Sequence, residues 1–197
     1  MAITAIPNPN YCFVNWTGPV TIPTSPISTV VLQQTQSVRA NFAQTVTSAV
    51  STSVLNPSAN HDLLSVGLSA RTNCASAANV PVQVFGDEDD QTATDSKGTV
   101  FSPDATNITL GALKLRAERV DSGDGRVYLI VVRATDAAGN NGFSCNSVVV
   151  PHDSSAAALA SVNNQAMAAR AYCQANGGAP PHGYFVIGDG PLIGPKK

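Results

Sequence analysis

The sequence predicts an all-β protein, a β-sandwich with an extended N-terminal arm and a C-terminal helix. Short segments between residues 45 and 153 alternate apolar with polar residues, as strands with one buried face do. Turn-forming residues separate these segments, and no helical pattern lies between them, an arrangement typical of a sandwich. We expect four parts: an uncharged arm at 1–44, the sandwich at 45–153, a helix at 154–176 and a Pro/Gly-rich tail at 177–197.

The predicted arm is interrupted by prolines and is almost uncharged. Arg39 is the only charged side chain before His61. Prolines interrupt helices and favour an extended chain, although residues 28–44 fit either a helical stripe or a strand. Apolar residues in an extended segment require a groove or a sheet edge, on the same subunit or on a neighbour. We therefore expect partner contacts at three aromatic residues of the arm, Tyr11, Phe13 and Trp16.

Seven segments of the sandwich region have a strand pattern. Six of them alternate apolar with polar or small residues or are short and rich in apolar residues, whereas the Val-Tyr-Leu-Ile-Val-Val run has the continuous pattern of a strand buried on both faces. The segments are Thr45–Val54, Leu64–Ala70, Val80–Val84, Ile108–Leu110, Leu113–Glu118, Arg126–Ala134 and Phe143–Val150.

The helix is predicted from its end signals and from a narrow apolar face. Asp153 or Ser154 can cap its start, and Gly177 and Gly178 close its end. The apolar face consists mainly of small residues, namely Leu159, Val162, Ala166, Ala169 and Cys173. The tail that follows holds one apolar patch, Tyr184–Ile187.

Overall composition excludes several classes of function. Charged residues make up only 12% of the chain and the net charge is −2. The chain therefore has no positive electrostatic potential that would attract nucleic acid. No apolar run reaches the length of a membrane span. The pairs His61-Asp62 and His152-Asp153 lack a Gly-x-Ser-x-Gly nucleophile motif, and no phosphate-binding loop follows a strand. We expect a protein that is not an enzyme.

A run of acidic residues is the candidate metal site. Four consecutive carboxylates repel one another, and calcium takes six to eight oxygen ligands from loops of this kind. The spacing does not match an EF-hand, and a solvated acidic loop is the alternative to an ion site. The acidic residues are Asp87, Glu88, Asp89, Asp90 and Asp95, and further ligands are expected from Asp136, Asn140 or Glu118.

The four cysteines predict two disulfides. They are Cys12, Cys74, Cys145 and Cys173, with no Cys-x-x-Cys spacing and no interleaved histidine that would indicate zinc. Disulfides place the protein in an oxidising compartment, outside the cell or on its surface. Four cysteines allow three pairings, and spacing alone does not choose among them.

Four motifs in order resemble bacterial cell-surface immunoglobulin-like modules of the hyalin-repeat and fibronectin-like kind. They are Leu113–Arg119, Gly123–Tyr128, Ala134–Asn140 and Val148–Asp153, and Leu55–His61 is similar to a further segment of these modules with its Trp and Pro residues changed. The resemblance implies an immunoglobulin-like sandwich and supports the calcium site. It also implies disulfides between Cys74 and Cys145 and between Cys12 and Cys173.

These observations lead to one function hypothesis and two alternatives. We expect an extracellular structural subunit that assembles with copies of itself into a filament or surface layer through its uncharged arm, stabilised by calcium and disulfides. The first alternative is an adhesive module that binds surface glycans through exposed aromatic side chains. The second is a decoration protein of a virion.

Overall fold

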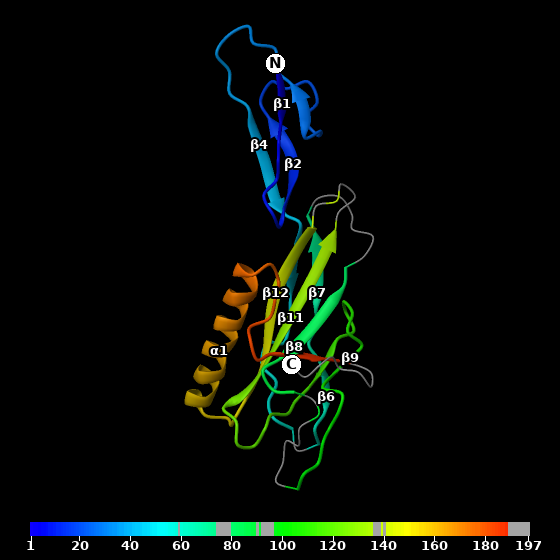
Figure 1. The fold of residues 1–197 in the computed structure, drawn as a ribbon, viewed down its shortest axis with the longest axis vertical. Coiled ribbons are helices and arrows are strands. Elements are labelled where there is room, and N and C mark those ends of the chain that lie inside the picture. The colour runs from blue at the N-terminus through cyan, green and yellow to red at the C-terminus, as the bar shows by residue number, and fades with distance from the viewer. Residues whose placement is uncertain are drawn as a thin grey trace. The chain divides into compact units, whose positions relative to one another are not determined.

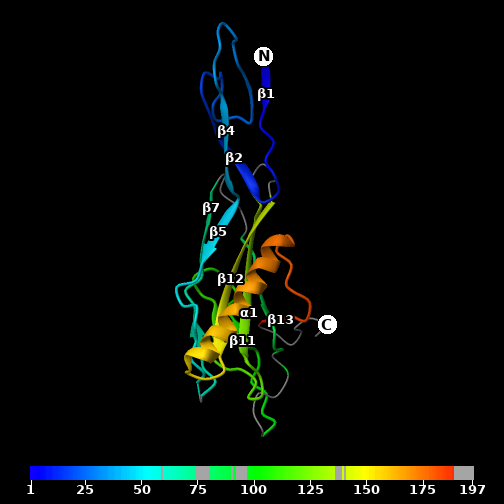
Figure 2. The ribbon, with the colours of Figure 1, turned by 90° about the vertical axis from the view of Figure 1, so that its left-hand side faces the viewer.

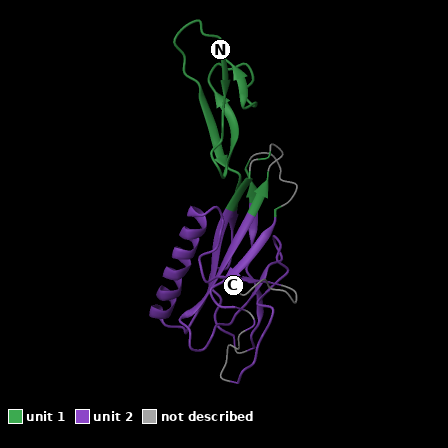
Figure 3. Cartoon of the chain, in the orientation of Figure 1, with its two compact units in different colours: residues 1–47, 71–80, 133–143 green, residues 48–70, 81–132, 144–197 purple. Residues whose placement is uncertain are grey.

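The computed structural model describes residues 1–58, 60–73, 80–89, 91, 97–135, 139 and 141–188. The fold is mostly β-structure with one helix near the C-terminus, α1 (Ala156–Ala175) (Figure 1). The chain divides into two compact units, coloured separately in Figure 3. Unit 1 contains residues 1–47, 71–80 and 133–143, and unit 2 contains residues 48–70, 81–132 and 144–197.

The N-terminal residues of unit 1 form two pairs of antiparallel strands. β1 (Ala2–Thr4) pairs with β3 (Ile27–Thr29), and β2 (Tyr11–Thr17) pairs with β4 (Arg39–Gln44). A break in register between Phe13 and Asn15 marks a bulge in β2. The expectation of an extended arm that lies on another surface therefore differs from the structure, in which these strands pair with one another.

Proline positions explain why this segment folds on itself. A proline has no N–H to donate, but its carbonyl group still accepts a hydrogen bond. The Trp16 N–H donates to the Pro23 carbonyl at 2.8 Å, and the Ala5 N–H donates to the Pro26 carbonyl at 2.8 Å. These prolines therefore stop helices without stopping the chain from making backbone hydrogen bonds between its strands.

A four-stranded sheet forms the centre of unit 2. Its order is β12 (Asn141–Pro151), β11 (Gly125–Thr135), β8 (Val82–Gly86) and β13 (Phe185–Ile187), with the far ends of β11 and β12 in unit 1. All residues from Val127 to Val132 have 0% exposure, so β11 is buried on both faces as its continuous apolar run predicts. The apolar patch of the tail provides β13, which adds to β8 as an edge strand.

A three-stranded sheet and one further strand pair complete the β-structure. The sheet has the order β6 (Leu63–Ser65), β10 (Lys114–Arg116) and β9 (Ala105–Thr106), and β5 (Val46–Ala49) pairs with β7 (Ser69–Thr72). Leu64–Ala70 was expected as one strand, but Gly67 has a left-handed backbone with φ +60° that separates β6 from β7.

The predicted strand Ile108–Leu110 was wrong. Asn107 has φ +52°, and the residues that follow it form a turn in which the Leu113 N–H donates to the Thr109 carbonyl at 3.2 Å. A residue with positive φ lies outside the β region, so it interrupts a strand. The strand in this region, β9, therefore lies before Asn107.

Helix α1 packs on the four-stranded sheet (Figure 2). The Ser155 side chain caps its start and accepts a hydrogen bond from the Ala158 N–H at 3.1 Å, one residue after the predicted cap positions. The small residues Ala166 and Ala169, together with Val162, bring the helix close to Val127 and Val149 of the sheet. Four of the five residues of the predicted face are buried, Val162, Ala166, Ala169 and Cys173, whereas Leu159 is exposed.

Candidate functional site

A buried arginine lies at the centre of the charged groups of unit 2. Arg126, near the start of β11, has 0% exposure although arginine is rarely buried. Its Nε donates to Glu88 Oε2 at 2.8 Å, and its Nη1 donates to Asp104 Oδ2 at 2.5 Å and to the Tyr128 hydroxyl at 2.9 Å. A fully buried guanidinium is tolerated only with such partners, because desolvating an isolated charge costs several kcal/mol (order of magnitude).

Arg116 extends this group of charges across β10. Its Nε donates to Asp104 Oδ1 at 2.9 Å, so Asp104 receives one arginine on each oxygen. Its other nitrogens donate to the carbonyl groups of His61 at 2.6 Å and Pro103 at 2.7 Å. The Tyr128 hydroxyl donates to the Arg116 carbonyl at 3.0 Å, which joins β11 to β10. We call Glu88, Asp104, Arg116, Arg126 and Tyr128 the arginine network.

A histidine–glutamate pair lies beside the network. His61 Nδ1 hydrogen-bonds Glu118 Oε2, and the His61 ring stacks on Phe101 with ring centres 3.6 Å apart. Glu118 is 3% exposed, and its Oε1 has no hydrogen-bond partner among the described residues. Burial, with a smaller contribution from the Asp104 carboxylate, raises the pKa of Glu118.

The chemistry of these groups favours a structural role. The carboxylates of Glu88 and Asp104 are ion-paired with arginine, and burial raises the pKa of the Tyr128 phenol, which keeps it neutral. Arginine does not lose its proton in proteins, so the network offers no general base at its centre. Removing one partner of such a buried pair is strongly destabilising, because the other charge is left buried and uncompensated.

Three of the predicted calcium ligands lie in the described part of the loop after β8. Asp87 Oδ1 accepts from the Val127 N–H at 2.8 Å, and Glu88 Oε2 accepts from the Val120 N–H at 2.9 Å in addition to Arg126. Asp89 Oδ1 accepts from the Gln91 N–H at 2.7 Å. Asp90, Asp95, Asp136 and Asn140 lie outside the described residues, and the remaining candidate, Glu118, pairs with His61. Asp87 and Glu88 therefore both accept hydrogen bonds from residues of β11. Calcium binding at this loop stays a prediction.

Burial has a separate effect on Asp87. It raises the pKa of this carboxyl group to about 6, with a smaller raising effect from Glu88, while the hydrogen bond from Val127 acts in the opposite direction. A carboxylate that is costly to ionise is stabilised by any cation that reaches it. Among the described residues, however, no group of three His, Cys, Asp or Glu side chains is arranged to hold a metal ion.

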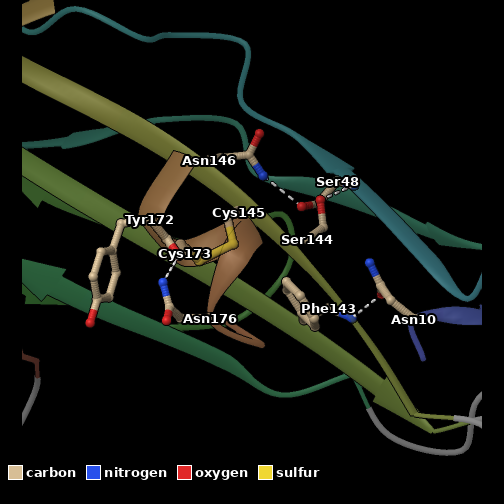
Figure 4. The surroundings of a disulfide bond; sticks show 9 residues. All are labelled: Asn10, Ser48, Phe143, Ser144, Cys145, Asn146, Tyr172, Cys173 and Asn176. Atoms are coloured by element: carbon tan, nitrogen blue, oxygen red, sulfur yellow. Dashed lines mark hydrogen bonds between the residues drawn. A yellow bond between two sulfur atoms is a disulfide. The ribbon is translucent and has the colours of Figure 1, made fainter. Parts of the chain in front are cut away.

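The disulfide pairing implied by the resemblance was wrong. Cys145 of β12 is bonded to Cys173 of α1, with Cα atoms 6.3 Å apart (Figure 4). Cys145 and Val149 lie on the same face of β12, the face that α1 covers, which brings Cys145 opposite the buried face of the helix. Cys12 is also disulfide-bonded, and Cys74 lies outside the described residues.

The three aromatic residues predicted to contact a partner have different surroundings in unit 1. Trp16 is 8% exposed, and its Nε1 donates to the Ser25 carbonyl at 2.8 Å. Phe13 lies between Trp16 and Phe42, with ring centres 5.6 Å and 6.1 Å away. Tyr11 is 42% exposed. Sugar binding by stacking requires an exposed ring face, and Tyr11 offers more of its surface than Trp16 does.

Residues 1–46 match the family model described as the divergent InlB B-repeat domain, a repeat of bacterial surface proteins. The match covers the strands β1 to β4 and ends at the first residue of β5. Comparisons with curated proteins and with solved structures return no match. No helix within the described residues is long and apolar enough to cross a membrane.

Sequence reasoning missed most of the arginine network. Arg126 stands next to the Val-Tyr-Leu-Ile-Val-Val run that was predicted to be buried, so its burial was readable from its position. Asp104, which pairs with it, lies 22 residues away in a segment without a clear pattern. Pairing across such a distance follows from strand order, which the local sequence does not encode.

Proposed function

We propose that this chain is a non-enzymatic structural module of a bacterial cell surface. The observation that carries the proposal is the match of residues 1–46 to a repeat of bacterial surface proteins. The Cys145–Cys173 disulfide supports the same location, because disulfides persist in oxidising compartments outside the cytosol.

Unit 2 is proposed to be an immunoglobulin-like sandwich of its two larger sheets. The edge of β12 supports this: Val54 adds to it through a parallel bridge with Val149, whereas the pairs β6–β10, β9–β10, β8–β11 and β8–β13 are antiparallel. The Tyr128 hydroxyl bond to the Arg116 carbonyl links the central strands of the two sheets. Helix α1 covers the opposite face of β11, so the central strand is buried on both sides.

Unit 1 is proposed to be the surface through which copies of the chain assemble. Several of its apolar side chains are exposed, and Arg39 is its only charged residue within the first 47 positions. Exposed apolar patches on a weakly charged surface favour association with a protein partner. The most exposed of these side chains are Ile6 at 81%, Met1 and Val31 at 67%, Ile27 at 64% and Leu32 at 62%.

Sedimentation of the full chain over a range of concentrations tests the assembly. We expect wild-type protein to associate with rising concentration, and the double variant Ile27→Lys/Val31→Lys to stay monomeric at concentrations at least ten times higher. Val100→Lys replaces an exposed apolar residue of unit 2 and serves as the matched control. Wild-type protein that remains monomeric throughout, or equal effects of the control and the double variant, would contradict assembly through unit 1.

Calcium is proposed as a stabilising ion of the loop after β8. The raised pKa of Asp87 supports it, since a divalent cation relieves the cost of ionising a half-buried carboxyl group. Thermal unfolding in 5 mM calcium (about fifty times a dissociation constant of order 0.1 mM) is expected to lie several degrees above unfolding in EDTA. Equal midpoints in both conditions would reduce the loop to a solvated acidic segment.

A further inference from the structure

A groove of about 370 Å³ opens within unit 2 between helix α1 and the outer edge of β12. Its volume lies at the lower end of the range for ligand sites. Three segments line it: Ala49, Val50 and Ser53 before the Val54 bridge, Asn146, Ser147 and Val149 of β12, and Asn163, Ala166, Met167 and Arg170 of α1. The wall is mixed, with hydroxyl and amide groups beside Val50, Val149 and Met167.

The groove exists because the chain leaves the edge of β12 there. Val149 pairs on this edge, donating its N–H to the Ser53 carbonyl at 2.9 Å and accepting from the Leu55 N–H at 2.8 Å. The N–H groups of Ser51 and Thr52 instead donate to the Val66 carbonyl, at 3.1 and 3.2 Å. Ser51 and Thr52 are therefore turned away from β12, and the chain meets β12 again at Ser48, whose N–H donates to Ser144 Oγ at 3.1 Å.

Ser147 is the next residue of β12 whose backbone points to this edge. Backbone groups of a strand alternate in direction, so the N–H and C=O of Ser147 point the same way as those of Val149. The Asn146 side chain lies on the other face and donates to Ser48 Oγ at 2.6 Å, which holds the departing segment in place (Figure 4). Ser147 is only 9% exposed, so the donor and acceptor that point to this edge are reached through the groove.

Arg170 brings a positive charge to the same groove. It is the only charged residue in the 20-residue helix α1, and it is exposed. No carboxylate of the described residues forms an ion pair with its guanidinium group, in contrast to Arg116, Arg119 and Arg126. A guanidinium without a partner beside a groove is suited to a ligand carboxylate.

We propose that this groove binds an extended acidic peptide of a partner protein, which pairs with β12 at Ser147 and places a carboxylate on Arg170. Main-chain pairing at a strand edge is a common way to bind extended peptides. Charge complementarity selects an acidic segment, and Met167, which is 52% exposed, offers an adaptable apolar contact. An acidic glycan fits less well, because the groove lining contains no aromatic ring on which a sugar would stack.

Nuclear magnetic resonance of the isotope-labelled full chain tests the proposal without knowledge of the partner sequence. The probes are two pools of acetylated, amidated pentapeptides, random except for a central aspartate in one pool and a central asparagine in the other. We expect the aspartate pool to shift the amide resonances of Ser147, Asn163 and Arg170, and to slow hydrogen exchange at the Ser147 amide. Binding by the asparagine pool is expected to be at least fivefold weaker.

Two variants separate the proposed site from general charge effects. Arg170→Gln is expected to abolish the preference for the aspartate pool, whereas Arg39→Gln, which removes one positive charge from unit 1, leaves that preference intact. Equal binding of both pools by wild-type protein, no shift at these amides at millimolar peptide, or an unchanged preference in Arg170→Gln would overturn the proposal. Shifts produced by oligogalacturonate and not by the peptides would overturn it in favour of a glycan site.

Discussion

Asp87 and Glu88 are neighbours in the chain but have different partners in the fold. Glu88 accepts hydrogen bonds from Arg126 and from the Val120 N–H, so its charge is compensated. Asp87 accepts a hydrogen bond from the Val127 N–H, which lowers its pKa, but burial raises the pKa by more. The acidic loop therefore contains one carboxylate that stabilises the buried arginine and one that is costly to ionise.

This cost predicts a pH-dependent stability that Asp87→Asn removes. The pKa of Asp87 rises from 3.8 to about 6 on folding, so its unfavourable contribution is absent below pH 3.8 and complete above pH 6. Without calcium, Asp87→Asn is expected to raise the free energy of unfolding by about 1–2 kcal/mol at pH 7.5, after allowance for partial solvation. At pH 3.5 the difference is expected to be close to zero. Urea unfolding in EDTA at both pH values measures it.

Asp124→Asn is the matched control for this prediction. Asp124 is exposed and accepts a hydrogen bond from Gln165 Nε2 at 2.9 Å, a contact that an amide oxygen also accepts. We expect this control to change the free energy of unfolding by less than about 0.5 kcal/mol at either pH. An Asp87→Asn variant that is less stable than wild type at pH 7.5 in EDTA would contradict the burial argument.

At the scale of elements, helix α1 depends on tertiary contacts. Its buried face consists of one valine, two alanines and Cys173, so it buries little apolar area for its 20 residues. Helices in proteins are stabilised mainly by packing of their apolar faces, so a helix with a small apolar face gains little stability from packing. The bond between Cys145 and Cys173 supplies the missing attachment at the C-terminal end of the helix.

Removal of this disulfide is therefore expected to be costly. The double variant Cys145→Ser/Cys173→Ser is expected to lose about 3 kcal/mol of unfolding free energy, as for other disulfides that close loops of this size. Urea unfolding followed by circular dichroism measures the loss, with Ala160→Ser, at an exposed helix position, as a control for the polar substitution. An unchanged midpoint would mean that packing alone holds the helix.

At the scale of the whole molecule, charge is distributed unevenly along the chain. The first 61 residues hold one charged side chain, whereas the 13 acidic residues all lie from Asp62 onward. Association through the exposed apolar residues of unit 1 is therefore expected to depend little on salt. The same sedimentation series at about 0.05 and 0.5 M salt should give association constants within about threefold, because screening acts on charged groups.

Local pattern predicted the elements that depend on neighbouring residues. Alternation and the continuous Val-Tyr-Leu-Ile-Val-Val run located β11 and β12, and the small-residue face with its end signals located α1 within a residue or two. Local pattern failed at β9, at β13 and in the N-terminal segment. In the last of these the prolines suggested an extended arm, and the strands pair with one another.

By itself the sequence determined a mostly β-chain with one C-terminal helix and a weakly charged N-terminal segment. It also contained the acidic residues and cysteines from which a metal site and disulfides were predicted. Only the tertiary structure decided which of these residues meet. Glu88 and Asp104 converge on Arg126 from segments 38 and 22 residues away, and Cys145 faces Cys173 because α1 folds back onto β12. Such pairings depend on strand order and on which face each strand buries, and these are properties of the folded chain as a whole.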